Sequence, residues 1–157
     1  MRISIKYLMT MGLCVTILAG CKKGSSQPDP VIPDTTKPTI TIVKPTAGQS
    51  FTPGSSIAFQ ASFSDNEKLG SYAITISRVF TGGFILKNVP VPVDWSYSKA
   101  TTNFNSGVKQ QEIILNDISI PKDLGGSPIT TGKYYLKVTC TDAAANSYSV
   151  TVEIAIN

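Results

Sequence analysis

Residues 132–156 read GKYYLKVTCTDAAANSYSVTVEIAI, and apolar side chains alternate with polar ones along both halves of this stretch. The apolar positions are Tyr134, Leu136, Val138 and Cys140 in the first half, and Tyr148, Val150, Val152, Ile154 and Ile156 in the second. A period of two is typical of a β-strand with one buried face. Turn-forming residues from Asp142 to Asn146 separate the halves. The stretch therefore predicts two strands, over 133–141 and 147–156.

The same alternation recurs after Pro38, and no window from 39 to 157 shows a helical stripe. Clusters of Gly, Pro, Asp and Asn between the apolar runs favour turns. Further strands are predicted at 39–43, 56–64, 71–79, 83–87 and 111–120, with a short additional strand near Trp95–Ser98. About seven short strands separated by such turn-forming clusters indicate two packed antiparallel sheets. The expected fold class is an all-β sandwich over residues 39–157.

Two motifs resemble those of Ig-like domains. Gly132-Lys133-Tyr134 resembles the tyrosine corner of immunoglobulin-like and fibronectin-type sandwiches. Thr141 to Asn146 is similar to the Asp-x-x-Gly-Asn turn of bacterial Ig-like domains, with Ala145 where glycine is usual.

More broadly, the segments KPTITIVKP (37–45), GSSIAFQASFSDNEKLGSYAITI (54–76) and GKYYLKVTCTDAAAN (132–146) resemble an uncharacterised family of Bacteroidetes-type lipoproteins. Members carry one Ig-like, fibronectin- or cadherin-like domain of unknown function. The resemblance covers residues 37–80 and 130–157, and it implies an Ig-like antiparallel β-sandwich of about seven strands.

The first twenty residues have the layout of a secretory signal: a basic start with Arg2 and Lys6, an apolar stretch, and two small residues. The apolar stretch of 12 residues, Tyr7–Leu18, is shorter than the roughly 20 that span a bilayer. Leu18-Ala19-Gly20-Cys21 resembles the bacterial lipobox, in which the cysteine receives a diacylglycerol and becomes the first mature residue. We therefore expect a cleaved lipoprotein signal peptide at 1–20 and lipidation of Cys21. The alternative is an ordinary signal peptide followed by an incidental cysteine.

Residues 22–38 read KKGSSQPDPVIPDTTKP, with four prolines and almost nothing apolar to bury. This composition is typical of a tether, extended where proline dominates and flexible at the Gly-Ser segment. At about 3.1 Å per residue, the tether could hold a domain up to roughly 50 Å from a lipid surface. The predicted organisation is thus a lipidated cysteine with a Pro/Ser-rich tether at 21–38, followed by the sandwich at 39–157.

Composition argues against several classes of function. Removing Arg2 and Lys6 from the 14 basic residues leaves 12 against 10 acidic ones, a net charge of +2, and no basic stretch with interleaved aromatics follows residue 23. Nucleic acid is therefore not an expected partner. The chain has no histidine, so Ser-His and Cys-His nucleophile pairs and histidine-based zinc sites are excluded. We expect no enzymatic activity and predict that Cys140, in phase with Leu136 and Val138, is a small buried side chain.

One group of oxygen-bearing residues is a candidate Ca²⁺ site. In the Ig-like chain order, Asp65, Asn66 and Glu67 come near Asp142 and Asn146, with Asp34 on the approaching tether. Oxygen ligands of this kind suit Ca²⁺, and cadherin-like domains use the comparable end in this way. The alternative is that Asp and Asn shape turns by bonding to their own backbone. Calcium is the one cofactor that the sequence suggests.

A second group lies in the segment FILKNVPVPVDWSY, residues 84–97. Pro90 and Pro92 exclude it from a central strand. Its alternating apolar residues, which include Trp95 and Tyr97, favour a face that closes the side of the core. The alternative is an exposed aromatic platform, in which Trp95 and Tyr97 form a binding patch for a sugar ring or a protein loop.

Together these features predict a non-enzymatic, membrane-anchored cell-envelope lipoprotein that serves as a binding or scaffold module. The alternative is a carbohydrate-binding accessory lipoprotein of a glycan-uptake system that uses the Trp95 edge, and a purely structural spacer stays open. The expected partners are the membrane, through the lipid, and an envelope protein or glycan. The expected location is the cell envelope, with the outer membrane favoured and the leaflet open.

Overall fold

The computed structural model describes residues 32–79 and 91–157, so the leader, Cys21 and the strand predicted at 83–87 lie outside the described residues. The described residues form strands, turns and bends, and none of them is helical. No helix that could cross a membrane occurs among them.

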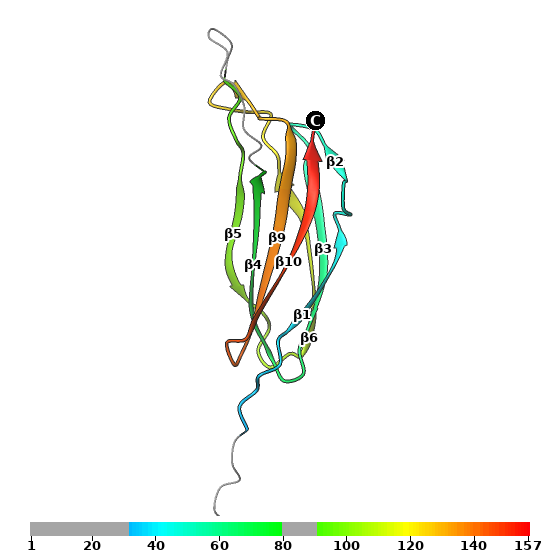
Figure 1. Ribbon diagram of the computed structural model, residues 1–157, viewed down its shortest axis with the longest axis vertical. Coiled ribbons are helices and arrows are strands. Elements are labelled where there is room, and N and C mark those ends of the chain that lie inside the picture. Colours follow the sequence, from blue (N-terminus) through cyan, green and yellow to red (C-terminus); the bar gives the residue numbers. More distant parts are fainter. Residues whose placement is uncertain (1–31, 80–90) are drawn as a thin grey trace, which may run out of the picture. The chain divides into compact units, whose positions relative to one another are not determined.

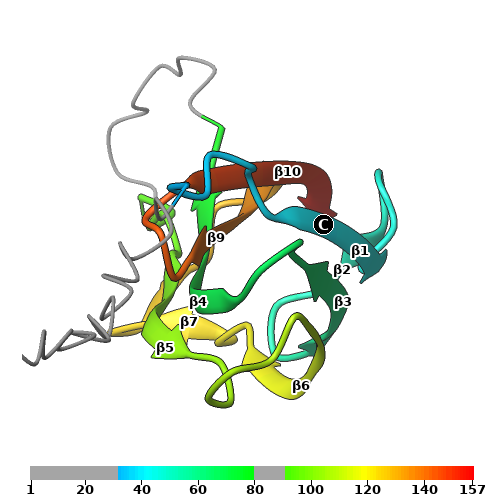
Figure 2. The ribbon, with the colours of Figure 1, turned by 90° about the horizontal axis from the view of Figure 1, so that it is seen from below.

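Two sheets face each other and enclose the core (Figures 1 and 2). The smaller sheet has the order β1 (Thr39–Lys44), β3 (Ser56–Ser64) and β6 (Gln110–Ser119). The larger has the order β2 (Ser50–Phe51), β10 (Ser147–Ile156), β9 (Gly132–Asp142), β4 (Leu69–Arg78) and β5 (Tyr97–Asn103). A small hairpin joins β7 (Asp123–Leu124) to β8 (Ser127–Pro128). The pairs within the two main sheets are antiparallel, except that β2 runs parallel to β10. The prediction of an all-β antiparallel sandwich is thus confirmed, with ten strands among the described residues where about seven were expected.

The core consists of the inward-facing residues whose alternation predicted the strands. Ile57, Phe59, Ala61 and Phe63 of β3 are fully buried, as are Ile74 and Ile76 of β4 and Leu136, Val138 and Cys140 of β9. Burying a large aliphatic or aromatic side chain stabilises a fold by roughly 1.5–3 kcal/mol. Cys140 is a free, buried cysteine, as its phase in the strand predicts.

The tyrosine corner is present at the start of β9. The Tyr134 hydroxyl donates a hydrogen bond of 2.7 Å to the carbonyl of Thr130, four residues upstream. The side chain is fully buried, and burial raises the pKa of Tyr134. Its ring lies 6.1 Å from that of Trp95, centroid to centroid. The motif therefore fixes the connection that leads into the central strand of the larger sheet.

Some strands differ from the prediction. The short strand predicted near Trp95–Ser98 is β5, which begins at Tyr97, extends to Asn103 and pairs with β4 at the edge of the larger sheet. The two-residue strand β2 and the β7–β8 hairpin were not predicted. These elements lie at edges or in connections, where one or two residues of pairing leave no alternating apolar pattern.

The two ends of the sandwich carry different loops. At one end lie residues 32–38, the connection from β3 to β4 and the turn from β9 to β10. At the other end lie the connection from β1 to β3, which contains β2, and the end of β10 (Figure 1). We call the first the tether end and the second the far end. Since β3 is nine residues long, the two ends are separated by roughly 27 Å.

Candidate metal centre at the tether end

Three carboxylates converge at the tether end. Asp34 precedes β1, Asp65 follows the last residue of β3, and Asp142 is the last residue of β9. Each offers one oxygen, and these oxygens lie within 4.8 Å of one another. The structure therefore brings together Asp65 and Asp142 with Asp34, which the sequence also places at this end.

The fold holds Asp65 and Asp142 by turn geometry. Asp65 Oδ2 accepts hydrogen bonds from the backbone N–H groups of Glu67 (3.0 Å) and Lys68 (2.8 Å). Asp142 is 4% exposed, and its Oδ1 accepts a bond of 2.8 Å from the backbone N–H of Asn146. Both side chains thus have the turn-shaping role that was the alternative to metal binding. Each carboxylate has a second oxygen, so each can shape its turn and still bind a metal ion.

The two predicted amide ligands act here as donors. Asn66 Nδ2 donates to Asp34 Oδ1 at 3.2 Å. Asn146 Nδ2 donates to the Asp34 carbonyl at 3.1 Å and to Asp142 Oδ2 at 2.8 Å. Asn66 and Asn146 therefore position the carboxylates, and Asn146 links the segment that precedes β1 directly to β9.

Two carboxylate oxygens of this cluster lack partners. Asp34 Oδ2 and Asp65 Oδ1 each expose less than 1 Å² and make no hydrogen bond with the described residues. A buried anionic oxygen without a partner carries a large desolvation cost. Among residues 32–79 and 91–157 the salt bridges are Arg78–Asp94 and Lys133–Glu153, so none of the three carboxylates is paired with a basic side chain. The nearby Lys109 ammonium instead donates to the Asn66 carbonyl, at 2.7 Å.

The pKa values of Asp34 and of the neighbouring Cys140 are both shifted by their surroundings. The hydrogen bonds from the Thr36 backbone and the Asn66 side chain lower the pKa of Asp34, so this carboxylate is charged at neutral pH. Burial, and after it the negative charges of Asp65 and Asp142, raises the pKa of the neighbouring Cys140 to about 12. The thiol therefore stays protonated at neutral pH, which leaves an all-oxygen donor set.

The other predicted site fares differently. Trp95 is 5% exposed and packs against Tyr134, while Tyr97 is half-buried against the core. The indole therefore closes the side of the core, as the apolar alternation favoured, and its burial argues against the alternative of an exposed aromatic platform at Trp95. Cys21, the predicted lipidation site, lies outside the described residues.

The described residues thus form an all-β sandwich with a cluster of carboxylates at one end. Residues 21–157 match the family described as Domain of unknown function (DUF4625), and the chain belongs to this family. No curated protein matches the sequence.

Two solved structures are similar to this chain. Spo0M, a sporulation control protein from Bacillus subtilis, is 11% identical with a TM-score of 0.42, over 77% of this chain and 49% of that chain. BslA, a bacterial hydrophobin, is 15% identical with a TM-score of 0.36, over 77% of this chain and 98% of that chain. The chain thus spans about half the length of Spo0M.

Proposed function

We propose that the protein is a non-enzymatic, lipid-anchored module of the cell envelope whose tether end binds Ca²⁺. The observation that carries the calcium site is the pair of buried, unpartnered oxygens, Asp34 Oδ2 and Asp65 Oδ1, beside the carboxylate of Asp142. The inference of a lipid anchor depends on the signal-like leader and on the lipobox-like sequence Leu18-Ala19-Gly20-Cys21. The family match supports the anchor because it begins at Cys21 and leaves out the leader.

The spacing of the carboxylates suits a single calcium ion. Oxygen ligands lie 2.3–2.6 Å from Ca²⁺, so two ligands on opposite sides of one ion are about 4.6–5.2 Å apart. The ligand atoms of Asp34, Asp65 and Asp142 fall within 4.8 Å of one another. Three carboxylates and waters supply the oxygen-only environment that Ca²⁺ prefers, whereas zinc and copper favour nitrogen or sulfur.

A bound ion would join three parts of the chain. Asp34 belongs to the end of the tether, Asp65 to the β3–β4 connection and Asp142 to β9. Binding would offset the repulsion among three carboxylates and supply partners for the two bare oxygens. The ion would therefore stiffen the junction through which an anchor at Cys21 holds the domain.

The calcium site is tested by thermal unfolding of the purified protein with Ca²⁺ and with a chelator. At a Ca²⁺ concentration of roughly 100 Kd, linkage stabilises the fold by about 2.7 kcal/mol, which raises Tm by roughly 5–10 °C. Asp34→Asn and Asp65→Asn should remove this rise. Without Ca²⁺ the same variants should be at least as stable as the wild type, because asparagine keeps one oxygen for the existing hydrogen bonds and lowers the repulsion among the three carboxylates.

The matched control is Asp117→Asn, which changes an exposed carboxylate on β6. This variant should keep the full response to Ca²⁺. An identical melt in Ca²⁺ and chelator for the wild type would refute the calcium site. If Asp117→Asn also lost the rise in Tm with Ca²⁺, the rise would come from the net charge of the protein and not from a site at the tether end.

The anchor is tested separately. Cys21→Ser should move the protein from the membrane fraction to the soluble fraction after lysis without detergent, because two acyl signals already give stable attachment. Mass spectrometry of the wild type should show an acylated N-terminal peptide that begins at Cys21. A mature protein that starts elsewhere or lacks acyl mass would overturn the anchor and leave the calcium result intact.

A second candidate function is carbohydrate binding. With Trp95 in the core, the edge at residues 91–97 does not offer the aromatic platform that this function needs. A pocket at the far end of the sandwich offers another site.

A further inference from the structure

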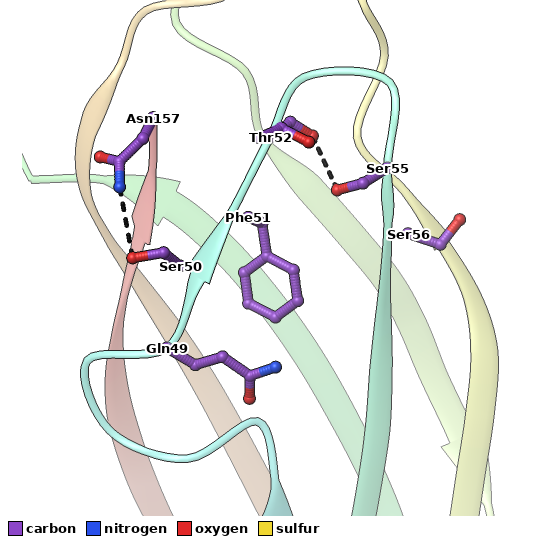
Figure 3. A pocket seen from close by; sticks show the side chains of 7 residues that line it. All are labelled: Gln49, Ser50, Phe51, Thr52, Ser55, Ser56 and Asn157. Carbon is purple, nitrogen blue, oxygen red and sulfur yellow. Dashed lines mark hydrogen bonds between the residues drawn. The ribbon is translucent and has the colours of Figure 1, made fainter.

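The far end of the sandwich contains a pocket of about 340 Å³. It lies between β2, the residues that lead into β3 and the end of β10 (Figure 3). Its volume is near the lower end of the range for small-ligand pockets, about 300–1,000 Å³. The Phe51 ring lies at its centre, with Gln49 and Ser56 on either side (Figure 3).

We propose that this pocket binds a neutral saccharide, such as one or two rings of a glycan. The inference rests on the proposed function as a binding module and names the class of its ligand. It places the sugar site at Phe51, away from the Trp95 edge.

The lining has the chemistry that a sugar ring requires. One aromatic ring provides an apolar surface for the C–H face of a pyranose, and every other lining side chain carries a hydroxyl or an amide. No lining side chain is charged. Pockets of this composition fix a ligand by a few polar groups around an aromatic anchor. A charged ligand would find no charged side chain of opposite sign in this lining, and a wholly apolar one would leave the surrounding hydroxyls and amides unpaired.

Several polar groups remain able to bind a ligand. Gln49 Oε1 accepts a bond of 3.1 Å from the Thr46 backbone, while Gln49 Nε2 makes no hydrogen bond with the described residues. Ser50 Oγ accepts a bond of 3.2 Å from Asn157 Nδ2, so its own proton is free to be donated. The Nε2 donor of Gln49 thus lies near the Phe51 ring, and Ser50 Oγ adds a second donor on the other side of β2 (Figure 3); both can bond to the hydroxyls of a sugar.

The backbone around the pocket is fixed before a ligand arrives. Asn157 N donates to the Phe51 carbonyl and Ala155 N to the Gln49 carbonyl, each at 2.9 Å. On the other side, Ile120 N donates to the Ser55 carbonyl at 2.8 Å. A preformed pocket lowers the entropic cost of binding, which matters for a ligand that makes few contacts.

The position of the pocket agrees with display on a tether. The pocket lies roughly 27 Å from the tether end, along the length of β3. An anchor attached through residues 32–38 would therefore hold the opposite end toward the membrane and present the pocket away from it.

The test uses the full-length protein in lipid nanodiscs and saturation-transfer difference NMR, which detects weak binding. The probes are four neutral disaccharides, cellobiose, maltose, lactose and chitobiose, each at about 10 mM to reach the millimolar affinities expected of a shallow pocket. At least one should receive saturation, strongest at its ring C–H protons. Phe51→Leu, which keeps an apolar side chain, should weaken binding at least roughly fivefold.

A second variant separates lost binding from lost folding. Gln49→Glu keeps an oxygen to accept the Thr46 N–H and replaces the Nε2 donor by a negatively charged acceptor, so it should weaken binding in a folded protein. Tyr148→Leu is the matched control, because Tyr148 is an exposed aromatic near the start of β10, at the tether end and away from the pocket. This control should bind like the wild type.

The proposal is overturned if no disaccharide receives saturation, or if Phe51→Leu and Gln49→Glu both bind as tightly as the wild type. The same measurement with chelator, and with Cys21→Ser in solution without nanodiscs, distinguishes this failure from loss of the calcium site or of the anchor. Loss of the calcium site or of the anchor should leave saccharide binding at the far end unchanged.

Discussion

Gly70 lies so close to Asp142 that a Cβ atom at Gly70 would be 2.5 Å from the Asp142 carbonyl oxygen. The same atom would be 2.8 Å from the carbonyl oxygen of Thr141. The pairing of β4 with β9 shifts register at this point, between Leu69 and Ser71. The absence of a side chain at Gly70 therefore allows the end of β9, with its carboxylate, to lie against β4.

Gly70→Ala should destabilise the fold and weaken the calcium response together. The clash is with backbone atoms, so β9 must shift, at a cost of about 1–3 kcal/mol, and Asp142 must move with it. Urea unfolding with and without Ca²⁺ measures both effects. Ser71→Ala, one residue along the same strand, is the control and should stay within about 0.5 kcal/mol of the wild type. Wild-type stability in Gly70→Ala would contradict the importance of this contact.

Ala145→Gly should stabilise the protein. Ala145 has a φ of 71°, in the left-handed region that costs a residue with a side chain about 1–2 kcal/mol. Glycine removes this strain but adds freedom to the unfolded chain, so the net gain is about 0.5–1 kcal/mol. The measurement is the free energy of unfolding in urea.

The neighbouring Ala144→Gly is the matched control for that change. Ala144 is also exposed in the same turn, but its φ is not positive, so glycine there should only destabilise. A gain of stability in both variants would mean that the turn geometry is not the cause.

Cys140 should make the stability of the fold depend on pH in the alkaline range. Its pKa in the folded protein is raised to about 12 from an ordinary value of 9.0. The thiolate therefore forms first in the unfolded chain, so stability is intact below pH 9 and falls as pH rises toward 12.

Unfolding by urea at several pH values, in the wild type and in Cys140→Ala, measures this effect. The variant loses packing at all pH values, but the part of the alkaline decline that comes from the thiol should disappear. In the native wild type at pH 8, a thiol reagent should react only as fast as the protein opens, because Cys140 is fully buried. Rapid labelling under native conditions would show that the buried position is wrong.

The sequence predicts the central strands well because burial on one face imposes a strict period of two. Ile57, Phe59, Ala61 and Phe63 in β3 follow this period, as do the inward residues of β4, β9 and β10. At the sheet edge the constraint is weaker. The residues of β5 are exposed or only half-buried, so its sequence lacks the alternating apolar pattern that would indicate a seven-residue strand.

The candidate sites show the same limit. The convergence of Asp65 and Asp142 follows from the chain order of the sandwich, which places the β3–β4 and β9–β10 connections at one end. The sequence does not reveal which carboxylate oxygens lack partners, because that depends on the orientations of Asn66 and Asn146. The pocket around Phe51 was missed entirely, since it is formed by short segments that meet only through the parallel pairing of β2 with β10.

The hydrogen bonds of Asp34 also determine how the domain would respond to mechanical force. Asn66, which bonds its carboxylate, follows β3 of the smaller sheet, whereas Asn146, which bonds its carbonyl, precedes β10 of the larger sheet. A pull on the chain ahead of Asp34 is therefore shared between both sheets before it reaches β1. The edge strand, which could otherwise be peeled from β3 one hydrogen bond at a time, is shielded from the load.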